Sequence, residues 1–408
     1  MECPNSKKNI NVCRTFLIYW LALILWQNLF KAETRGGIDA IFKVFLLGFL
    51  IVSFLQRKLF INRNNIIVLA LFGFSQMITL FLCDIQYQSI GVVVSYLYPI
   101  VYIFLVYCIG NNLTATKKQV DKMNNYILIV LLISIFYTLI FDPKQYTKAI
   151  QEQDSGYGSE LSSFFLSMHE YALYLFYGIT VCVNRITEKK KGYFVYYLLF
   201  FTFFATMVFT FSRTALVGCL VYLCIYALLN RKSNFSKVFV VLVCVAFLVI
   251  LTTPAISDYV YKVVWKSGHM SSREKLNELA GIYFEEGTIL NKFFGHGITS
   301  VNTFFVNEGD IQSVHNAYLH VLLCYGITGI AFFVAYLIVQ VVNILRFFKY
   351  DKAVALSSFG MLVFSILVMI PNTFLIFSSS IDCFFITSMM LVIPKYQRNA
   401  VRQQIYYK

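Results

Sequence analysis

The sequence has little charge for its length: only 13% of its 408 residues are Asp, Glu, Lys or Arg, whereas 59% are hydrophobic. This balance excludes an ordinary soluble domain and predicts an all-α integral membrane protein. No C-x-x-C pair occurs among the ten cysteines, which argues against zinc and thiol-redox motifs. There is no P-loop pattern and no acidic pair at a metal-ligand spacing, so we expect no nucleoside triphosphate, metal or other cofactor.

Apolar runs predict about twelve membrane-spanning helices in a single polytopic domain covering residues 1–408. Their approximate ranges are 15–30, 38–55, 66–83, 90–109, 126–141, 163–183, 193–211, 214–229, 237–253, 315–345, 353–371 and 376–394. As one helix, the tenth span would be about 46 Å long, which exceeds a hydrocarbon core of about 30 Å. Either its first turns stand outside the lipid or it breaks at Gly326 or Gly329.

The distribution of Lys and Arg predicts the orientation. Of the 34 Lys and Arg residues, 23 lie in the two tails and in alternate connections around residues 57–63, 117–122, 185–191, 231–237 and 346–352. By the positive-inside rule, both termini are cytoplasmic and the long connection 254–314 is extracytoplasmic. The net charge of +14 then reflects topology and anionic-lipid contact, and we expect no nucleic-acid partner.

The extracytoplasmic connection has helical patterning of its own. Ser271–Glu274 resembles a capping box, and Leu276, Leu279, Ala280 and Tyr283 follow a helical stripe. We therefore expect short amphipathic helices over the outer mouth of the bundle.

Ionisable residues near the outer ends of spans are the candidates for chemistry, because a charge at mid-bilayer costs at least about 2.5–3.5 kcal/mol. They are His169 and Glu170 in the sixth span, Arg213 at the turn before the eighth, Arg273 in the outer loop, His315 at the start of the tenth, and Asp382 in the twelfth. The structural alternatives are snorkelling arginines, an interhelical hydrogen-bond pair and a polar helix end. For His315–Asn316 the structural alternative is N-terminal capping of the tenth span; Ser313 could fill that role instead and leave the imidazole free.

The chemistry that suits this set is phosphate binding. Two arginines, a helix N-terminus and backbone N–H groups freed by Gly295 and Gly297 favour a diphosphate, although a simple turn also explains the two glycines. A lipid-diphosphate-linked glycosyl donor fits this site. The arginines would stabilise the departing diphosphate, and His315 or Glu170 would deprotonate an acceptor hydroxyl, with inversion at the anomeric centre.

A series of short motifs carries a family resemblance. In order they are Ser212–Arg213–Thr214–Ala215–Leu216, Ser272–Arg273, Phe294–Gly295–His296–Gly297, His315–Asn316–Ala317–Tyr318–Leu319 and Tyr325–Gly326–Ile327–Thr328–Gly329. Over about residues 160–345, the sequence resembles the O-antigen polymerase/O-antigen ligase superfamily of bacterial membrane glycosyltransferases. It departs from the family at residues 163–172, where relatives often carry an Asn/Pro-rich signature and this chain has His169–Glu170.

The resemblance implies a GT-C-like glycosyltransferase of the bacterial cytoplasmic membrane, with its active site facing the exterior and an undecaprenyl-diphosphate-linked oligosaccharide as its substrate. It implies catalytic roles for His315, Arg213 and Arg273, and we assign substrate contacts to Ser212, Asn316, Gly295, Gly297, His169, Glu170 and Asp382. By analogy with Phe/Tyr/Ile/Asn-rich family members, we expect a polymerase of O-antigen or capsular repeat units, working with a chain-length regulator and a flippase. The alternatives are a ligase that transfers glycan to lipid A-core and a transporter of polysaccharide or lipid-linked oligosaccharide.

Overall fold

The computed structural model describes residues 63–84, 117–151, 161–165, 168–189, 192–210, 212–254, 270–307 and 316–370, with the single residues 48, 92, 93, 96 and 314. Every regular element among these residues is a helix. The spans expected over 15–30, 38–55, 90–109 and 376–394 lie wholly or mostly outside the described residues, as do His315 and Asp382.

The described helices include those expected over the apolar runs of the sequence. They are α3 (Arg63–Thr79), the π-helix η3 (Leu80–Asp84), α5 (Lys117–Phe141), α6 (Lys144–Gln151), α7 (Met168–Thr187), α8 (Tyr193–Phe209), α9 (Arg213–Leu229), α10 (Asn234–Thr252), α12 (Met270–Glu286), α13 (Ile289–Phe294), α14 (Ile298–Asn307), α15 (Ala317–Phe347) and α16 (Lys352–Val368). Among the residues that the structure describes, two stretches, Asn124–Phe141 and Ala317–Phe347, are long and apolar enough to cross a membrane.

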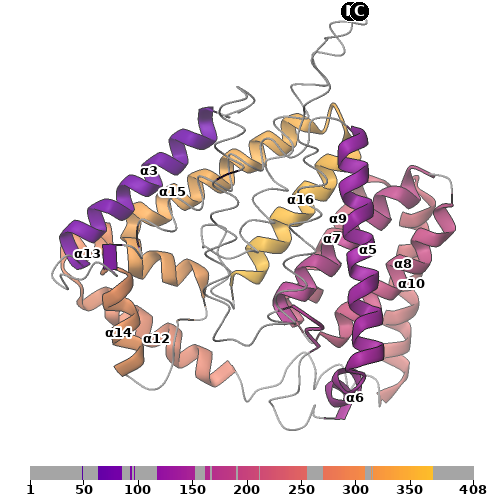
Figure 1. Cartoon of the computed structure of the whole chain (residues 1–408), viewed down its shortest axis with the longest axis horizontal. Helices are drawn as coiled ribbons and strands as arrows, with labels where there is room; N and C mark the ends of the chain where they lie inside the picture. The colour runs from indigo at the N-terminus through magenta and orange to yellow at the C-terminus, as the bar shows by residue number, and fades with distance from the viewer. Residues whose placement is uncertain are drawn as a thin grey trace, which may run out of the picture.

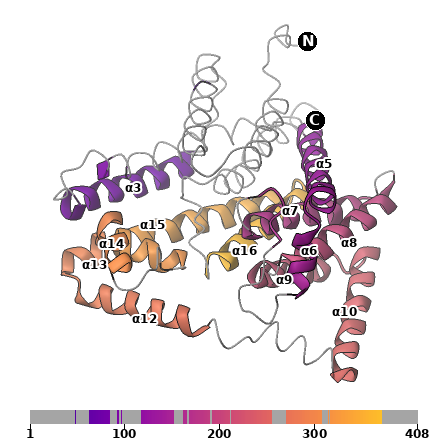
Figure 2. The same ribbon diagram turned by 60° about the horizontal axis from the view of Figure 1, so that its bottom comes forward.

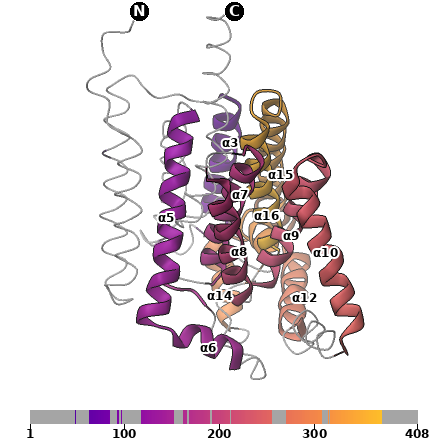
Figure 3. The same cartoon turned by 90° about the vertical axis from the view of Figure 1, so that its right-hand side faces the viewer.

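Helix α7 is the centre of one group of helices, with α5, α8, α9 and α16 packed around it (Figure 3). Almost every side chain from Glu170 to Ile186 is buried. Phe176 stacks on Phe364 of α16 with ring centroids 4.3 Å apart. At its far end, Arg185 forms a 3.1 Å ion pair with Asp121 of α5. Because α7 has 20 residues, its two ends are about 30 Å apart.

The second group is built on α15, which lies beside α3 and carries α12, α13 and α14 at its N-terminal half (Figures 1 and 2). Helix α15 is broken at Gly326, where φ is 67° and ψ is −166°. A break at this residue is one of the two solutions that the excess length of the span predicted.

The break in α15 lets the turn after α13 contact its backbone directly. The main-chain N–H of His296 donates to the carbonyl of Leu323 at 2.7 Å, and that of Gly297 donates to the carbonyl of Cys324 at 3.2 Å. The Thr328 hydroxyl donates to the carbonyl of Phe293 at 2.9 Å. Main-chain contacts therefore attach the α12–α14 segment to α15.

Helix α12 has the apolar stripe that its periodicity predicts. Leu276 and Ala280 are buried, while Leu279 and Tyr283 are partly buried against the core. The Tyr283 ring stacks on His296 and on Phe304, with centroids 4.2 Å and 4.1 Å away. The stripe thus ties α12 to the α13–α14 turn.

Large apolar side chains remain exposed on the outer faces of several helices. On α8 these include Phe194 and Leu198, which are 71% and 68% exposed, and on α10 they include Val241 at 60%. A soluble protein rarely leaves such continuous apolar faces uncovered, whereas lipid-facing helices require them.

Candidate functional site

The starts of α7 and α9 are joined by a hydrogen bond between His169 and Ser212. The His169 Nδ1 and Ser212 Oγ atoms lie 2.9 Å apart, although the two residues are 43 positions apart in sequence. Ser212 is fully buried and is the N-cap residue of α9. Either the Ser212 hydroxyl or the ring N–H donates in this hydrogen bond, depending on the tautomer of the imidazole.

The tight turn before α9 is rich in hydroxyl groups, which explains how it ends an aromatic helix. The Thr210 hydroxyl donates to the carbonyl of Met207 at 2.7 Å and accepts from the N–H of Ser212 at 3.4 Å. Side-chain hydroxyls that bond nearby backbone groups compete with the helix ladder and favour turns. This turn therefore positions Ser212 for its hydrogen bond to His169, and Arg213 follows as the first residue of α9.

One acidic and one basic residue are next in sequence to His169 and Ser212. Glu170 is only 2% exposed and lies in the first turn of α7, where the helix dipole favours a carboxylate. Arg213 is the first residue of α9 and is exposed. Its guanidinium adds to the positive end of the α9 dipole, an arrangement that attracts anions. We call His169, Glu170, Ser212 and Arg213 the helix-start site.

The start of α15 lies at the same end of the bundle as the end of α16. The N–H of Ala317 donates to the carbonyl of Met369 at 3.0 Å, and the Tyr318 hydroxyl donates to that of Ile366 at 2.9 Å. Asn316 caps α15, because its Oδ1 accepts from the N–H groups of Tyr318 and Leu319 at 3.0 Å and 3.1 Å. Asn316, and not Ser313, therefore caps the tenth predicted span.

The glycines of the Gly295–His296–Gly297 motif have a structural role. Both have positive φ angles, 86° and 91°. The Gly295 N–H donates to the carbonyl of Asn291 at 2.7 Å, and the Gly297 N–H donates to that of Cys324. The expectation that these two glycines free N–H groups for a ligand is therefore wrong.

His296, which stands out in the sequence only as part of the glycine motif, is a buried residue. Its side chain is 7% exposed, and its Nδ1 lies 3.1 Å from the Asn291 amide nitrogen, which is a donor. The proton of the neutral ring is then on Nε2, which is buried without a hydrogen-bond partner beside Gly287. Burial lowers the pKa of His296. A histidine between two glycines was the available sequence signal.

The side chains of three further candidates lie outside the part of the chain that the structure describes. Arg273 lies near the start of α12, but its side chain is not among those described. His315 and Asp382 lie outside the described residues. Within the described part of the chain, no group of three or more His, Cys, Asp or Glu residues could hold a metal ion.

The fold and the helix-start site together indicate the class of protein to which the chain belongs. The described residues form an all-helical bundle with long apolar helices, lipid-facing apolar surfaces and a polar cluster where helices start, as in an integral membrane protein with a site at one membrane face.

Comparison with known families is more specific. Residues 198–334, about a third of the chain, match the family model Wzy_C, described as O-Antigen ligase. The match supports the O-antigen ligase/polymerase superfamily and confirms the resemblance seen in the motifs. Members of this superfamily are glycosyltransferase-like enzymes of the bacterial inner membrane that act on lipid-linked oligosaccharides. The matched range contains Ser212, Arg213 and the glycine motif, while His169 and Glu170 precede it. No curated protein matches the sequence.

Proposed function

We propose that the protein polymerises undecaprenyl-diphosphate-linked oligosaccharide repeat units into O-antigen or capsular polysaccharide at the outer face of the cytoplasmic membrane. The observation that carries the proposal is the His169–Ser212 hydrogen bond beside Arg213, where α7 and α9 start. The proposal includes the twelve-span, GT-C-like architecture with both termini in the cytoplasm. A flippase and a chain-length regulator would be its partners.

The reaction we propose is a direct displacement that inverts the anomeric centre. The bond between the anomeric carbon and the diphosphate breaks as the acceptor oxygen forms its new bond to the same carbon. Arg213 and Arg273 stabilise the charge that accumulates on the departing diphosphate. His315 or Glu170 takes the proton of the acceptor hydroxyl.

The geometry supports a positioning role for His169 in this reaction. Its hydrogen bond to Ser212 holds the residue next to Arg213 in place, and a fixed cation stabilises a transition-state charge better than a mobile one. Ser212, Asn316 and Asp382 remain our candidates for contacts to the glycan or diphosphate.

Analysis of surface glycan in a deletion strain tests the polymerase proposal. Loss of a polymerase leaves single repeat units on the acceptor. Loss of a ligase leaves an acceptor without glycan and an accumulation of lipid-linked polymer. Transport of the lipid-linked substrate by the purified protein, without bond formation, would instead support the transporter. Either of the last two results overturns the proposal.

The assignment of Arg213 has a separate test. Arg213→Ala is expected to abolish long-chain glycan, because loss of one transition-state contact costs about 10²–10³-fold in rate. Arg213→Lys keeps the charge but loses the planar fork, so it should retain part of the activity. Arg346→Ala is the matched control, because this exposed arginine lies in the last turn of α15 on the predicted cytoplasmic side. A normal glycan ladder in Arg213→Ala, at normal protein level, would refute the assignment.

A further inference from the structure

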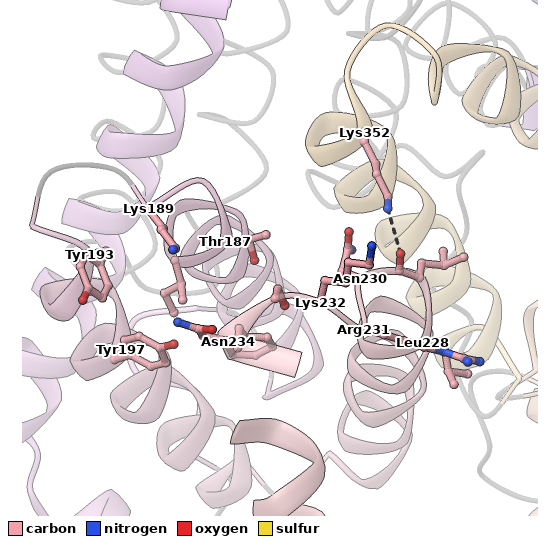
Figure 4. A pocket seen from close by; sticks show the side chains of 14 residues that line it. Thr187, Lys189, Tyr193, Tyr197, Leu228, Asn230, Arg231, Lys232, Asn234 and Lys352 are labelled. Carbon is pink, nitrogen blue, oxygen red and sulfur yellow. Dashed lines mark hydrogen bonds between the residues drawn. The ribbon is translucent and has the colours of Figure 1, made fainter. Parts of the chain in front are cut away.

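A basic cavity of about 680 Å³ lies at the far ends of α7 and α9 from the helix-start site (Figure 4). Helices α7 and α9 end at this cavity, while α8, α10 and α16 begin at it with Tyr193, Asn234 and Lys352. Three connections that the Lys and Arg distribution predicts to be cytoplasmic therefore meet here. No local pattern in the sequence joins these three connections into one site.

The cavity has an excess of positive charge. Its cationic lining residues are Lys189, Arg231, Lys232 and Lys352, and no carboxylate is among the lining residues. The nearest acidic residues along the chain are Glu188 and Asp351, and the Asp351 carboxylate is engaged in capping α16. Such a lining attracts an anion.

The cations line different sides of the cavity. In Figure 4, Lys189 and Asn234 lie on one side of the cavity, and Lys352 lies on the other. The Lys352 ammonium donates one hydrogen bond to the carbonyl of Leu229 at 2.9 Å. An ammonium has three N–H groups, so this contact anchors Lys352 and leaves it able to donate to a ligand.

The floor of the cavity is aromatic and well packed. Phe235 is 3% exposed, and its ring packs edge-on against Phe200 of α8 and Tyr226 of α9, with centroids 5.3 Å and 6.1 Å away. The Tyr226 hydroxyl donates in turn to Thr187, another lining residue, at 2.7 Å. The ends of four helices are thereby held together around a formed cavity.

The surroundings of the cavity are apolar and exposed. Leu228, which lines it, is 61% exposed, and Phe194 and Leu198 on the adjoining helix α8 are 71% and 68% exposed. A small soluble anion such as phosphate has no apolar part that would contact these side chains. An amphiphile with an anionic headgroup and acyl chains would contact both the basic lining and the apolar surroundings.

We propose that this cavity binds the phosphate-bearing headgroup of an anionic phospholipid from the cytoplasmic leaflet, with its acyl chains along α8 and Leu228. Basic pockets between membrane helices on the cytoplasmic side bind such headgroups. The site is distinct from the helix-start site, and the proposal does not depend on which glycan reaction the protein performs.

The test measures equilibrium binding of a fluorescent phosphatidylglycerol to the purified full-length protein in a zwitterionic detergent. The variant is Lys189→Gln/Lys232→Gln, which removes two charges from the lining. The matched control is Lys122→Gln/Lys237→Gln, since both lysines are exposed on the predicted cytoplasmic side but do not line the cavity. Each lining lysine is worth about fivefold in affinity, so the variant should bind about thirtyfold more weakly, and the control less than twofold.

Two further ligands identify what is recognised. Phosphatidylcholine with the same acyl chains is expected not to compete, and neither is free glycerol phosphate. Equal losses in the variant and the control would mean that general surface charge attracts the lipid, which overturns the proposal. Competition by glycerol phosphate as strong as that by the lipid also overturns it. If the double variant does not accumulate, Lys232→Gln alone is expected to weaken binding about fivefold.

Discussion

Replacing Gly295 with alanine is expected to destabilise the protein by about 2–6 kcal/mol. Its backbone has φ 86° and ψ 171°, a region that is essentially restricted to glycine and costs an L-residue about 1–3 kcal/mol. The added Cβ would also lie 2.2 Å from the carbonyl oxygen of Cys324 and 2.4 Å from the nitrogen of Tyr325. Both are main-chain atoms that cannot rotate away, and overpacking of this kind costs about 1–3 kcal/mol. The sum is a large part of a typical stability of about 5–15 kcal/mol.

Substitutions at two other glycines separate the cost of the backbone conformation from the cost of the steric clash. Gly192 has a φ of 77° but nothing within 4 Å of an added Cβ, so Gly192→Ala is expected to cost only about 1–2 kcal/mol. Gly281 is exposed within α12 with open space around it, and Gly281→Ala should stabilise by about 1 kcal/mol. Denaturant unfolding of the full-length protein in detergent measures all three. Equal losses for Gly295→Ala and Gly192→Ala would refute the steric reasoning.

Three further changes have predicted outcomes. Gly360→Ala places a methyl group 2.4 Å from the Tyr222 ring between α16 and α9, so we expect a loss of about 1–3 kcal/mol in the same unfolding assay. Arg185→Ala removes the ion pair to Asp121; because that carboxylate is partly exposed, the expected loss is about 1–3 kcal/mol, and Asp121→Asn should lose less. Burial lowers the pKa of His296 below its usual 6.5, so on acidification the unfolded chain takes up a proton before the folded protein does. The free energy of unfolding should therefore fall as the pH drops below about 6.5. His296→Gln should reduce this pH dependence in unfolding midpoints measured between about pH 7.5 and 5.5.

The elements that the sequence predicted correctly depend on local physics. Leu276 and Ala280 are buried in α12 because side chains four positions apart share one helix face, wherever that helix packs. The break at Gly326 follows from length, since a helix of 31 residues exceeds the bilayer core and glycine accepts the φ angle that a break requires.

The contacts that could not be predicted join distant parts of the chain. The sequence placed His169 and Arg213 at the same membrane face, but the His169–Ser212 hydrogen bond depends on the relative height and rotation of two helices, which no local pattern encodes. The same limit applies to the N–H group of Gly297, whose acceptor is the carbonyl of Cys324 in α15. The basic cavity was even harder to predict from the sequence, because the ends of five helices form it.

The attachment of the α12–α14 segment to α15 has a consequence for how such proteins diversify. The hydrogen bonds at His296, Gly297 and Phe293 use main-chain groups, and they impose little on side chains apart from two glycines and the Thr328 hydroxyl. Substitutions at the exposed positions of the segment can therefore accumulate without loosening its connection to the bundle. Exchanging residues 270–307 between relatives that retain the glycines should transfer whatever selectivity this segment carries, because the recipient's α15 already presents the required carbonyl groups.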